Sequence, residues 1–359
     1  MRRMDKGFGA ASLTAMRAFH HPDQARHTPR FFLTRGEVRP NFEVPERAAS
    51  LLAGLQALRI APDVAAPADR TALCRIHTPG YVEYLATAAA AWAELPNGGP
   101  EVVANIHPAP EMLAHGARAG DHIIGRAGWY SADVACPIGP GTWEANLSAA
   151  GVGLAAAAEA AAGRTAYALC RPPGHHAYAA RAGGHCYVNN AALAVEALRA
   201  AGAKRVATLD IDSHHGNGTQ GIFWEREDVL TVSVHGDPTR YYPWYVGHAE
   251  ERGAGAGLGR NLNMPLAIGS GDAPWLEAMA RGVQAARDFG AEALVVSLGF
   301  DASEHEPLNA LNVTADGFAR AGALIAGLGL PSALVQEGGY NIDLLGSLLQ
   351  RFLTGWSEA

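Results

Sequence analysis

The sequence has few cysteines and no long apolar run. Its 359 residues include four cysteines, and none of them forms a C-x-x-C pair. This excludes a zinc knuckle and gives no sign of a disulfide framework, so we expect reduced and mostly buried thiols. The Ala-rich runs are short and are broken by Glu, Arg or Gly. We therefore expect no membrane span and no membrane partner.

The sequence also lacks a dense run of basic residues. Lys and Arg are scattered, and the formal net charge is -7, which argues against nucleic acid as a partner. The segment 7–16 is too weakly apolar for a secretory signal, so a cytoplasmic location is predicted. With 48% hydrophobic and 18% charged residues, the chain has the composition of a globular protein with a large core.

The chain is predicted to hold a single large domain. Residues 1–15 differ in character from the rest and are interpreted as an N-terminal extension, which leaves 16–359 as the domain. Residues 17–44 are expected to form one short strand and a long loop. Residues 96–140 are rich in Gly, Pro, His and aromatic residues in irregular order, which is typical of a loop-rich insertion.

Strands, polar loops and helices alternate along most of the domain. The apolar patterns predict helices at 46–58, 79–92, 141–162, 189–201, 275–290 and 315–328, and strands at 166–170, 206–209, 229–234, 293–298 and 333–336. This alternation predicts an α/β fold with a mostly parallel sheet and helices on both faces. Polar residues follow the strands, at the sheet edge where ligands bind in such folds.

The stretch 206–219 changes from a buried strand to a concentration of polar groups. In an extended chain Asp210, Asp212 and His214 would lie on one face, with Gly216 and Gly218 turning the backbone beneath them. Buried like charges are costly unless a cation neutralises them, so a divalent metal bound through Asp212 and His214 is one interpretation. A surface Asp/His turn is the alternative, because short strings of this kind also occur in loops.

Five motifs in a fixed order narrow the interpretation. RPPGHH, GGHCYVNNAA, DIDSHHGNGT, SLGFDA and EGGY resemble those of the zinc-dependent histone deacetylase and acetylpolyamine amidohydrolase superfamily, over about residues 42–356. The resemblance implies the three-layer arginase-deacetylase fold. It also implies a hydrolase that removes an acetyl or other acyl group from an amine by attack of a metal-activated water.

The resemblance implies the metal ligands. Asp212, His214 and Asp301 would bind Zn²⁺, with Fe²⁺ or Co²⁺ as alternatives, and would leave positions open for water and the substrate carbonyl. Because two carboxylates and one imidazole nearly neutralise the ion, the water needs a neighbouring base.

The resemblance also implies the catalytic residues. His176 would be the base, and it would later donate its proton to the leaving amine. His175, paired with Asp210, would act as an electrostatic partner. Asn217 stands where some members of the superfamily have Asp, which should lower the pKa for proton transfer. Tyr340 would donate a hydrogen bond to the developing oxyanion.

A structural K⁺ is implied as well. In the superfamily it is bound by the backbone carbonyls of the residues matching Asp210, Asp212 and His214, together with those matching Ser233 and Val234.

Four further residues are expected to contact the substrate. Gly184 and His185 match the wall of a narrow acyl-lysine tunnel, where relatives usually have an aromatic residue in place of His185. This histidine could stack as that aromatic residue does or hydrogen-bond a polar substrate. Gly338 and Gly339 would let their loop swing and allow the backbone close to the substrate.

The substrate is left open between several small amides. The segment 229–259 and the insertion resemble the acetylpolyamine branch, in which the insertion forms a homodimer that narrows the tunnel mouth. Acidic residues of the insertion recognise the polyamine there, but a rough alignment puts Ile124 and Ala135 at those positions, with Asp133 and Asp121 nearby. An acylated small-molecule amine is the expected substrate, and a peptide acetyl-lysine or another small amide is the alternative.

Two other functions are disfavoured by the same residues. A noncatalytic metal-binding relative has no need to keep His175, His176 and Tyr340. An arginase-like enzyme would bind two metals, and the sequence contains no second set of ligands.

Overall fold

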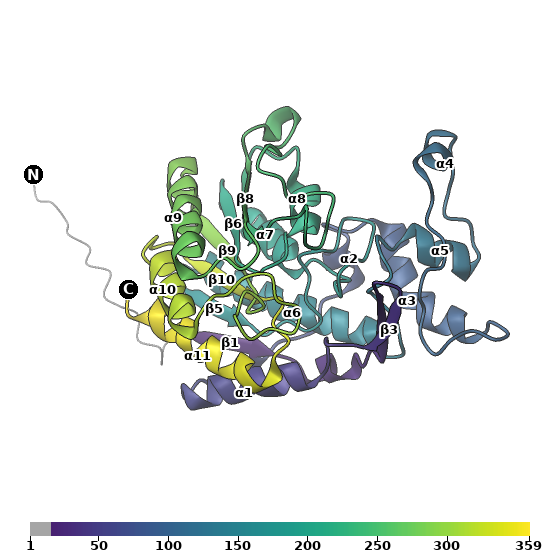
Figure 1. Ribbon diagram of the computed structural model, residues 1–359, viewed down its shortest axis with the longest axis horizontal. Helices are drawn as coiled ribbons and strands as arrows, with labels where there is room; N and C mark the ends of the chain where they lie inside the picture. The colour runs from purple at the N-terminus through teal and green to yellow at the C-terminus, as the bar shows by residue number, and fades with distance from the viewer. Residues whose placement is uncertain (1–15) are drawn as a thin grey trace, which may run out of the picture.

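An eight-stranded parallel sheet forms the centre of the molecule (Figure 1). The computed structural model describes residues 16–359. Along the sheet the strand order is β4-β1-β5-β10-β9-β6-β7-β8. The strands are β1 Arg17–His20, β4 Asp63–Val64, β5 Thr165–Ala168, β6 Val206–Asp210, β7 Val229–Gly236, β8 Asn261–Leu266, β9 Ala293–Leu298 and β10 Ser332–Gln336. The predicted parallel α/β architecture is confirmed.

Helices connect these strands and cover both faces of the sheet. They are α1 Glu46–Ala57, α2 Arg70–Leu73, α3 Pro79–Ala93, α4 Pro110–Ala114, α5 Ile123–Trp129, α6 Thr142–Ala161, α7 Asn190–Ala200, α8 Asn217–Phe223, α9 Asp272–Phe289, α10 Ala315–Ala326 and α11 Ile342–Ser357, with 3₁₀ turns η2 Pro22–Arg26 and η3 Gly255–Gly257. Each helix predicted from the sequence is present within two or three residues of its expected limits.

Alternate residues of the strands divide the core into two layers. On one face Leu209 and Val296 pack in a cluster with α1, α9, α10 and α11. On the other face Val206 and Val295 pack with α6 and α7. Successive side chains of a strand point to opposite faces. Because both faces are covered, β6 and β9 are mostly apolar and are buried along their whole length.

The parallel register brings the ends of the central strands to one edge. Asp210 at the end of β6 lies opposite Ser297 of β9 and Ser233 of β7. β10 pairs with both β5 and β9. The segments that follow β5, β6, β9 and β10 therefore emerge side by side, and these are the segments with the predicted site residues.

The structure corrects the expectations for the two segments without clear periodicity. Residues 17–44 contain an antiparallel hairpin, β2 Phe31–Thr34 with β3 Glu37–Pro40, in addition to the expected short strand. The insertion 96–140 contains the short helices α4 and α5 and projects at the right of Figure 1. Its helices are five and seven residues long, too short to give a readable apolar period.

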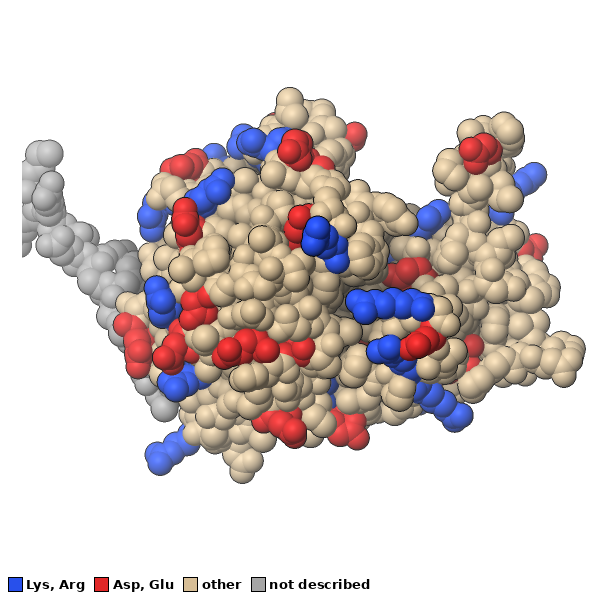
Figure 2. All heavy atoms as spheres, viewed as in Figure 1, with Lys and Arg blue, Asp and Glu red and all other residues tan. Residues whose placement is uncertain are grey.

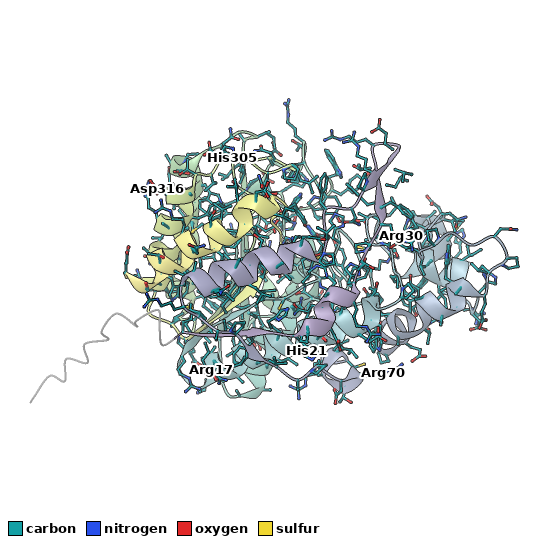
Figure 3. All side chains as sticks on the ribbon, turned by 90° about the horizontal axis from the view of Figure 1, so that it is seen from below. Arg17, His21, Arg30, Arg70, His305 and Asp316 are labelled. Carbon is teal, nitrogen blue, oxygen red and sulfur yellow. The ribbon has the colours of Figure 1, made fainter. Side chains whose placement is uncertain are left out.

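α1 and α11 lie side by side against the sheet (Figure 3). Their backbones come so close that a Cβ on Gly54 would lie 2.4 Å from the carbonyl oxygen of Gly346. Glycine is therefore required at this crossing, which holds the C-terminal helix next to the segment that precedes the site.

The surface and the thiols agree with the sequence. Acidic and basic side chains are interspersed over the face in Figure 2. In residues 16–359 no helix combines the length and apolarity needed to cross a membrane. All four cysteines are free, and three are buried. The interpretation of residues 1–15 as an extension lies outside the described residues.

The first prediction concerns His77, a buried histidine that its contacts keep neutral. Its Nδ1 donates to the Tyr178 carbonyl (3.1 Å) and its Nε2 accepts from the Asn189 amide (3.0 Å). Burial lowers the pKa of His77 to about 4. Because the unfolded chain then binds the proton more readily, stability should fall as the pH drops from about 6.5 to 4, by about 3 kcal/mol from this residue.

Denaturant unfolding at several pH values measures this effect. His77→Gln keeps one donor and one acceptor but cannot titrate, so its stability should depend less steeply on pH between 4 and 6.5 than that of the wild type. His305→Gln, which removes an exposed histidine (Figure 3), is the matched control. An unchanged slope in His77→Gln would contradict the prediction.

Candidate metal and catalytic site

Two carboxylates and one imidazole converge at the carboxyl edge of the sheet. Asp212 and His214 follow β6, and Asp301 follows β9. His214 Nδ1 lies 2.8 Å from Asp301 Oδ2 and 3.1 Å from Asp212 Oδ1. All three residues are buried, which excludes the alternative of a surface Asp/His turn.

The electrostatics of this group fit a divalent cation. Burial acts to lower the pKa of His214, but the carboxylates of Asp301 and Asp212 outweigh burial and raise it to about 9. Burial and the charge of Asp212 raise the pKa of Asp301. The two carboxylates therefore gain from positive charge placed between them, which the proton on His214 supplies here and which a metal ion would supply in its place. Oxygen and imidazole ligands of this kind suit Zn²⁺.

His175 lies between carboxylates and does not join the group of three. Its Nδ1 is 2.9 Å from Asp210 Oδ2, and its Nε2 is 3.8 Å from Asp212 Oδ1. Burial opposes the charged form, but Asp210, Asp212 and Glu337 together raise the pKa of His175 well above its usual value. The Asp210 side chain pairs with this histidine and is not part of the group of three. The expected common face for Asp210, Asp212 and His214 is therefore wrong, because the extended strand β6 ends at Asp210.

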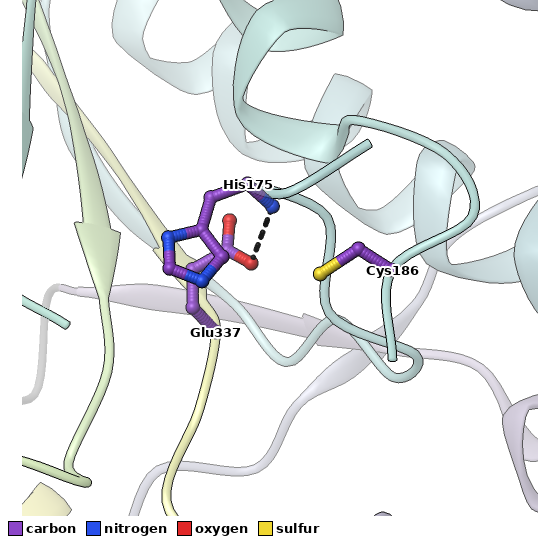
Figure 4. A group of neighbouring side chains, drawn as sticks. All are labelled: His175, Cys186 and Glu337. Atoms are coloured by element: carbon purple, nitrogen blue, oxygen red, sulfur yellow. Dashed lines mark hydrogen bonds between the residues drawn. The ribbon is translucent and has the colours of Figure 1, made fainter. Parts of the chain in front are cut away.

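Glu337 lies beneath His175 (Figure 4). Its Oε2 accepts hydrogen bonds from the backbone amides of Gly174 (2.6 Å) and His175 (3.0 Å). Its side chain is fully buried, and burial raises its pKa to about 7. Cys186 borders the same spot, and its thiol pKa is raised well above normal by burial. Glu337 thus anchors the turn from which both His175 and His176 project.

His176 is held in one orientation by Asn217. Its Nδ1 lies 2.6 Å from Asn217 Oδ1, and Asn217 Nδ2 donates to the Tyr178 hydroxyl (2.9 Å). An amide oxygen only accepts, so Nδ1 of His176 has the proton and Nε2 is left as an acceptor. Burial and the neighbouring His175 and His214 lower the pKa of His176 well below its usual value. Asn217 is the first residue of α8, not part of a turn.

Tyr340 lies in the polar segment that follows β10, and hydrogen bonds to its backbone fix its position. Its amide donates to Glu306 (Oε2 2.9 Å), and its ring lies under the guanidinium of Arg47 at 4.8 Å. Arg47 also donates to the Gly339 and Glu337 carbonyls, each at 2.6 Å. Burial raises the pKa of Tyr340 well above 10, so the phenol keeps its proton.

The four expected substrate contacts surround these side chains. Gly184 and His185 both have positive φ, of 51° and 67°. The His185 ring packs on Tyr340 at 5.9 Å and on Phe32 of the β2–β3 hairpin at 5.4 Å. Burial lowers the pKa of His185 to about 4, so it is a neutral ring that packs edge-on against Phe32 and tilted against Tyr340.

Glycine is required at positions 338 and 339, for two different reasons. A Cβ on Gly338 would lie 2.5 Å from both Asp212 Oδ2 and Asp301 Oδ2, and Gly339 has a φ of 119°. The Gly338 amide donates to Asp212 Oδ2 at 2.8 Å. The loop is tied down at this point, while the expected swing of the loop stays a prediction.

The residues expected to bind K⁺ lie behind the metal group. Ser233 pairs with Asp210 across β6 and β7, and its hydroxyl lies 2.8 Å from His235 Nδ1. His235 Nε2 donates to the Gly247 carbonyl (2.8 Å), so Nδ1 accepts the Ser233 proton. Both lone pairs of the Ser233 oxygen then remain for a cation. Val234 follows in the same strand.

Sequence reasoning assigned no role to several neighbours of the site. Tyr241 stacks on His214 at 4.4 Å, and Tyr242 packs edge-on against His176 at 4.9 Å. Glu306 and Glu337 accept hydrogen bonds from the backbone of the segments that contain Tyr340 and His175. The aromatic run 241–245 was a visible signal, but nothing in it distinguishes the two inward residues from Trp244 and Tyr245, which are exposed.

Comparison with known proteins identifies the family of the chain. The profile of the Histone deacetylase domain matches residues 41–356. The chain belongs to the histone deacetylase family. An acetylpolyamine amidohydrolase of Burkholderia pseudomallei is 44% identical over 95% of this chain and 98% of its own length, and acetylpolyamine amidohydrolase 1 of Pseudomonas aeruginosa is 40% identical over 96% and 99%.

The fold of the family is confirmed by a solved relative. A crystal structure of the acetylpolyamine aminohydrolase from Burkholderia pseudomallei superposes with a TM-score of 0.91, at 43% identity, over 95% of this chain and 98% of that one. The predicted superfamily, its bacterial branch and the three-layer fold are confirmed. Histone deacetylase family members are metal-dependent amide hydrolases, so the chain is assigned to an enzyme family, as predicted.

The second prediction tests the role of Gly338 at the metal group. Gly338→Ala places a methyl group against Asp212 and Asp301 and should lower the affinity for Zn²⁺ by about 10- to 100-fold, the range found when groups supporting a metal ligand are disturbed. Competition with a chelating dye measures the affinity.

Gly99→Ala is the matched control, because nothing lies within 4 Å of the added Cβ. Equal Zn²⁺ affinities in the two variants would contradict the geometry of the site.

Proposed function

We propose that the protein is a Zn²⁺-dependent amidohydrolase that removes an acetyl group from a small acylated amine, such as an acetylpolyamine. One observation carries this proposal: Asp212, His214 and Asp301 converge beside His176, whose proton position is fixed by Asn217. The names of the similar bacterial proteins add the acetylpolyamine. Residues 16–359 act as one catalytic domain.

The metal ligands are Asp212, His214 and Asp301. A bound Zn²⁺ supplies Lewis acidity toward the substrate carbonyl and a more acidic water, and Fe²⁺ or Co²⁺ can replace it. The backbone amides of Ser213 and Gly338 donate to the Asp301 and Asp212 carboxylates at 2.7 and 2.8 Å. These contacts orient the ligands.

His176 is the general base and later the general acid. Its Nε2 accepts a proton from the attacking water, while Nδ1 stays hydrogen-bonded to Asn217. The lowered pKa keeps the imidazole neutral before the reaction. The same proton then passes to the leaving amine as the C–N bond breaks, so the histidine is returned to its starting state.

His175, Asp210 and Tyr340 stabilise the transition state without exchanging a proton. His175 is held charged by the Asp210 carboxylate and offsets the negative charge of the reaction. The Tyr340 hydroxyl donates to the oxyanion that develops on the substrate carbonyl, and a donor of this kind contributes about 3–4 kcal/mol in comparable sites.

The proposal also covers the substrate contacts, a structural K⁺, the oligomeric state and the location of the enzyme. Gly184, His185, Gly338 and Gly339 surround the acyl group. The carbonyls of Asp210, Asp212 and His214, with Ser233 and Val234, hold a structural K⁺. A homodimer forms through the insertion 96–140, where Ile106, Met112 and Leu113 are exposed apolar residues. No nucleic acid or membrane takes part, and the enzyme acts in the cytoplasm.

The third prediction tests the reaction. Zn²⁺-loaded protein should release acetate from N-acetylputrescine and N-acetylcadaverine, and His176→Ala should reduce kcat by at least about 100-fold, the typical contribution of a general base. Asp301→Ala should lose both activity and stoichiometric Zn²⁺.

Full activity in either variant would contradict the mechanism. Hydrolysis of acetyl-lysine peptides in preference to the two amines would transfer the same chemistry to the alternative substrate. Ser347→Ala, a substitution at an exposed position of α11, is the control for handling of the protein.

A further inference from the structure

We infer that Asp133 is a positioning residue, which clasps together the two segments that border the base His176 on its solvent side. Its Oδ2 accepts hydrogen bonds from the Gly184 amide (2.9 Å) and the Tyr242 hydroxyl (2.6 Å). Its Oδ1 accepts from the Ala135 amide (2.8 Å). This inference rests on the proposed function and adds to it a role for the insertion 96–140.

The carboxylate joins segments that are far apart in the sequence. Asp133 lies in the last part of the insertion, Gly184 belongs to the segment between β5 and α7, and Tyr242 belongs to the loop after β7. Backbone bonds reinforce the first contact, because the Ala132 amide donates to the Ala182 carbonyl (2.7 Å). The clasp with Tyr242 has no such backbone support in the described hydrogen bonds, so it depends on the Asp133 side chain.

The two residues that donate to Asp133 Oδ2, Gly184 and Tyr242, both contact the proposed base. The Tyr242 ring meets His176 edge-on, with ring centres 4.9 Å apart and an interplanar angle of 87°. A Cβ on Gly184 would lie 2.4 Å from His176 Cδ2 and 3.0 Å from the Tyr242 ring. Gly184 and Tyr242 are half-buried, so they form the boundary between His176 and solvent. Movement of either one changes where a substrate can lie against His176.

The Tyr242 hydroxyl keeps its proton and donates it in a hydrogen bond to the Asp133 carboxylate. Burial and the nearby Asp133 raise the pKa of Tyr242 well above 10, so Tyr242 keeps its proton. A hydrogen bond from a hydroxyl to a charged carboxylate is short and about twice as strong as a neutral one. Removal of the carboxylate therefore leaves the Tyr242 hydroxyl without its acceptor.

The hydrogen bonds that Asp133 accepts within the protein indicate that it joins two segments and does not bind the ammonium group of a substrate. A carboxylate oxygen has two acceptor sites, and both sites of Asp133 Oδ2 are occupied by Gly184 and Tyr242. One site on Oδ1 remains. Asp133 therefore acts mainly on the protein, and its loss should affect charged and neutral substrates alike.

Two substrates of equal length test this inference. N-Acetylputrescine has a terminal ammonium, and N-pentylacetamide has a methyl group in its place. Asp133→Ala should raise KM about tenfold for both, the size expected for loss of one charge-assisted hydrogen bond, with a smaller fall in kcat because Asn217 still holds His176. Asp133→Asn keeps an oxygen acceptor and should recover part of the loss.

Tyr242→Phe removes only the hydroxyl of the clasp. It should raise KM in the same direction, and the double variant Asp133→Ala/Tyr242→Phe should be no worse than Asp133→Ala, because the two changes break the same bond. Asp316→Ala, which removes an exposed acidic residue of α10, should leave both KM values within about twofold of the wild type and is the matched control.

The outcomes separate the inference from the proposed function. A rise in KM confined to N-acetylputrescine in Asp133→Ala and Asp133→Asn would overturn the clasp in favour of an ammonium receptor. Additive effects of the two single substitutions would overturn it as well. If the wild type cleaves neither substrate, the proposed function fails. Denaturant unfolding of the wild type, Asp133→Ala, Tyr242→Phe and the double variant still decides whether Asp133 and Tyr242 are coupled.

Discussion

The burial of three carboxylates at one sheet edge is the constraint on which the rest of this structure depends. Asp210, Asp212 and Asp301 are each 3% exposed or less, and like charges in such surroundings are costly unless each is paired. Asp210 is paired with His175, while Asp212 and Asp301 share His214. The apolar strands below provide a rigid base for these side chains, and this is the arrangement proposed to bind one divalent cation.

The backbone around the carboxylates is shaped by the same requirement. A Cβ on Gly299 would lie 2.1 Å from Asp212 Oδ2, and one on Gly338 would clash with Asp212 and Asp301. Glycine at both places allows backbone to approach the charges. Farther out, Glu43 binds Arg47 and Arg171 (2.9 and 3.0 Å) in the interior, and through them holds the segments that contain Tyr340 and His175. The buried ion pairs of the interior therefore also position the residues proposed for catalysis.

Much of the fold could be predicted from the sequence because the central strands are mostly apolar segments, each followed by a polar loop. The proposed ligands Asp212 and Asp301 lie 89 residues apart, yet both follow predicted strands, so a parallel sheet brings them together. The β2–β3 hairpin and the helices of the insertion were not predicted, because their short segments have no clear period. The partnership of Asp133 with Tyr242 depends on where three loops meet, and no local pattern encodes that.

Asp212, His214 and Asp301 are proposed to form a site for one divalent cation. Calorimetric titration of metal-free protein with Zn²⁺ at pH 7.5, in buffers of different ionisation enthalpy, tests this proposal most directly. Because the pKa of His214 is about 9 without metal, binding of one ion should release about one proton. Asp212→Asn should abolish that binding step. A site that takes up Zn²⁺ without proton release, or with equal affinity in Asp212→Asn, would contradict the account.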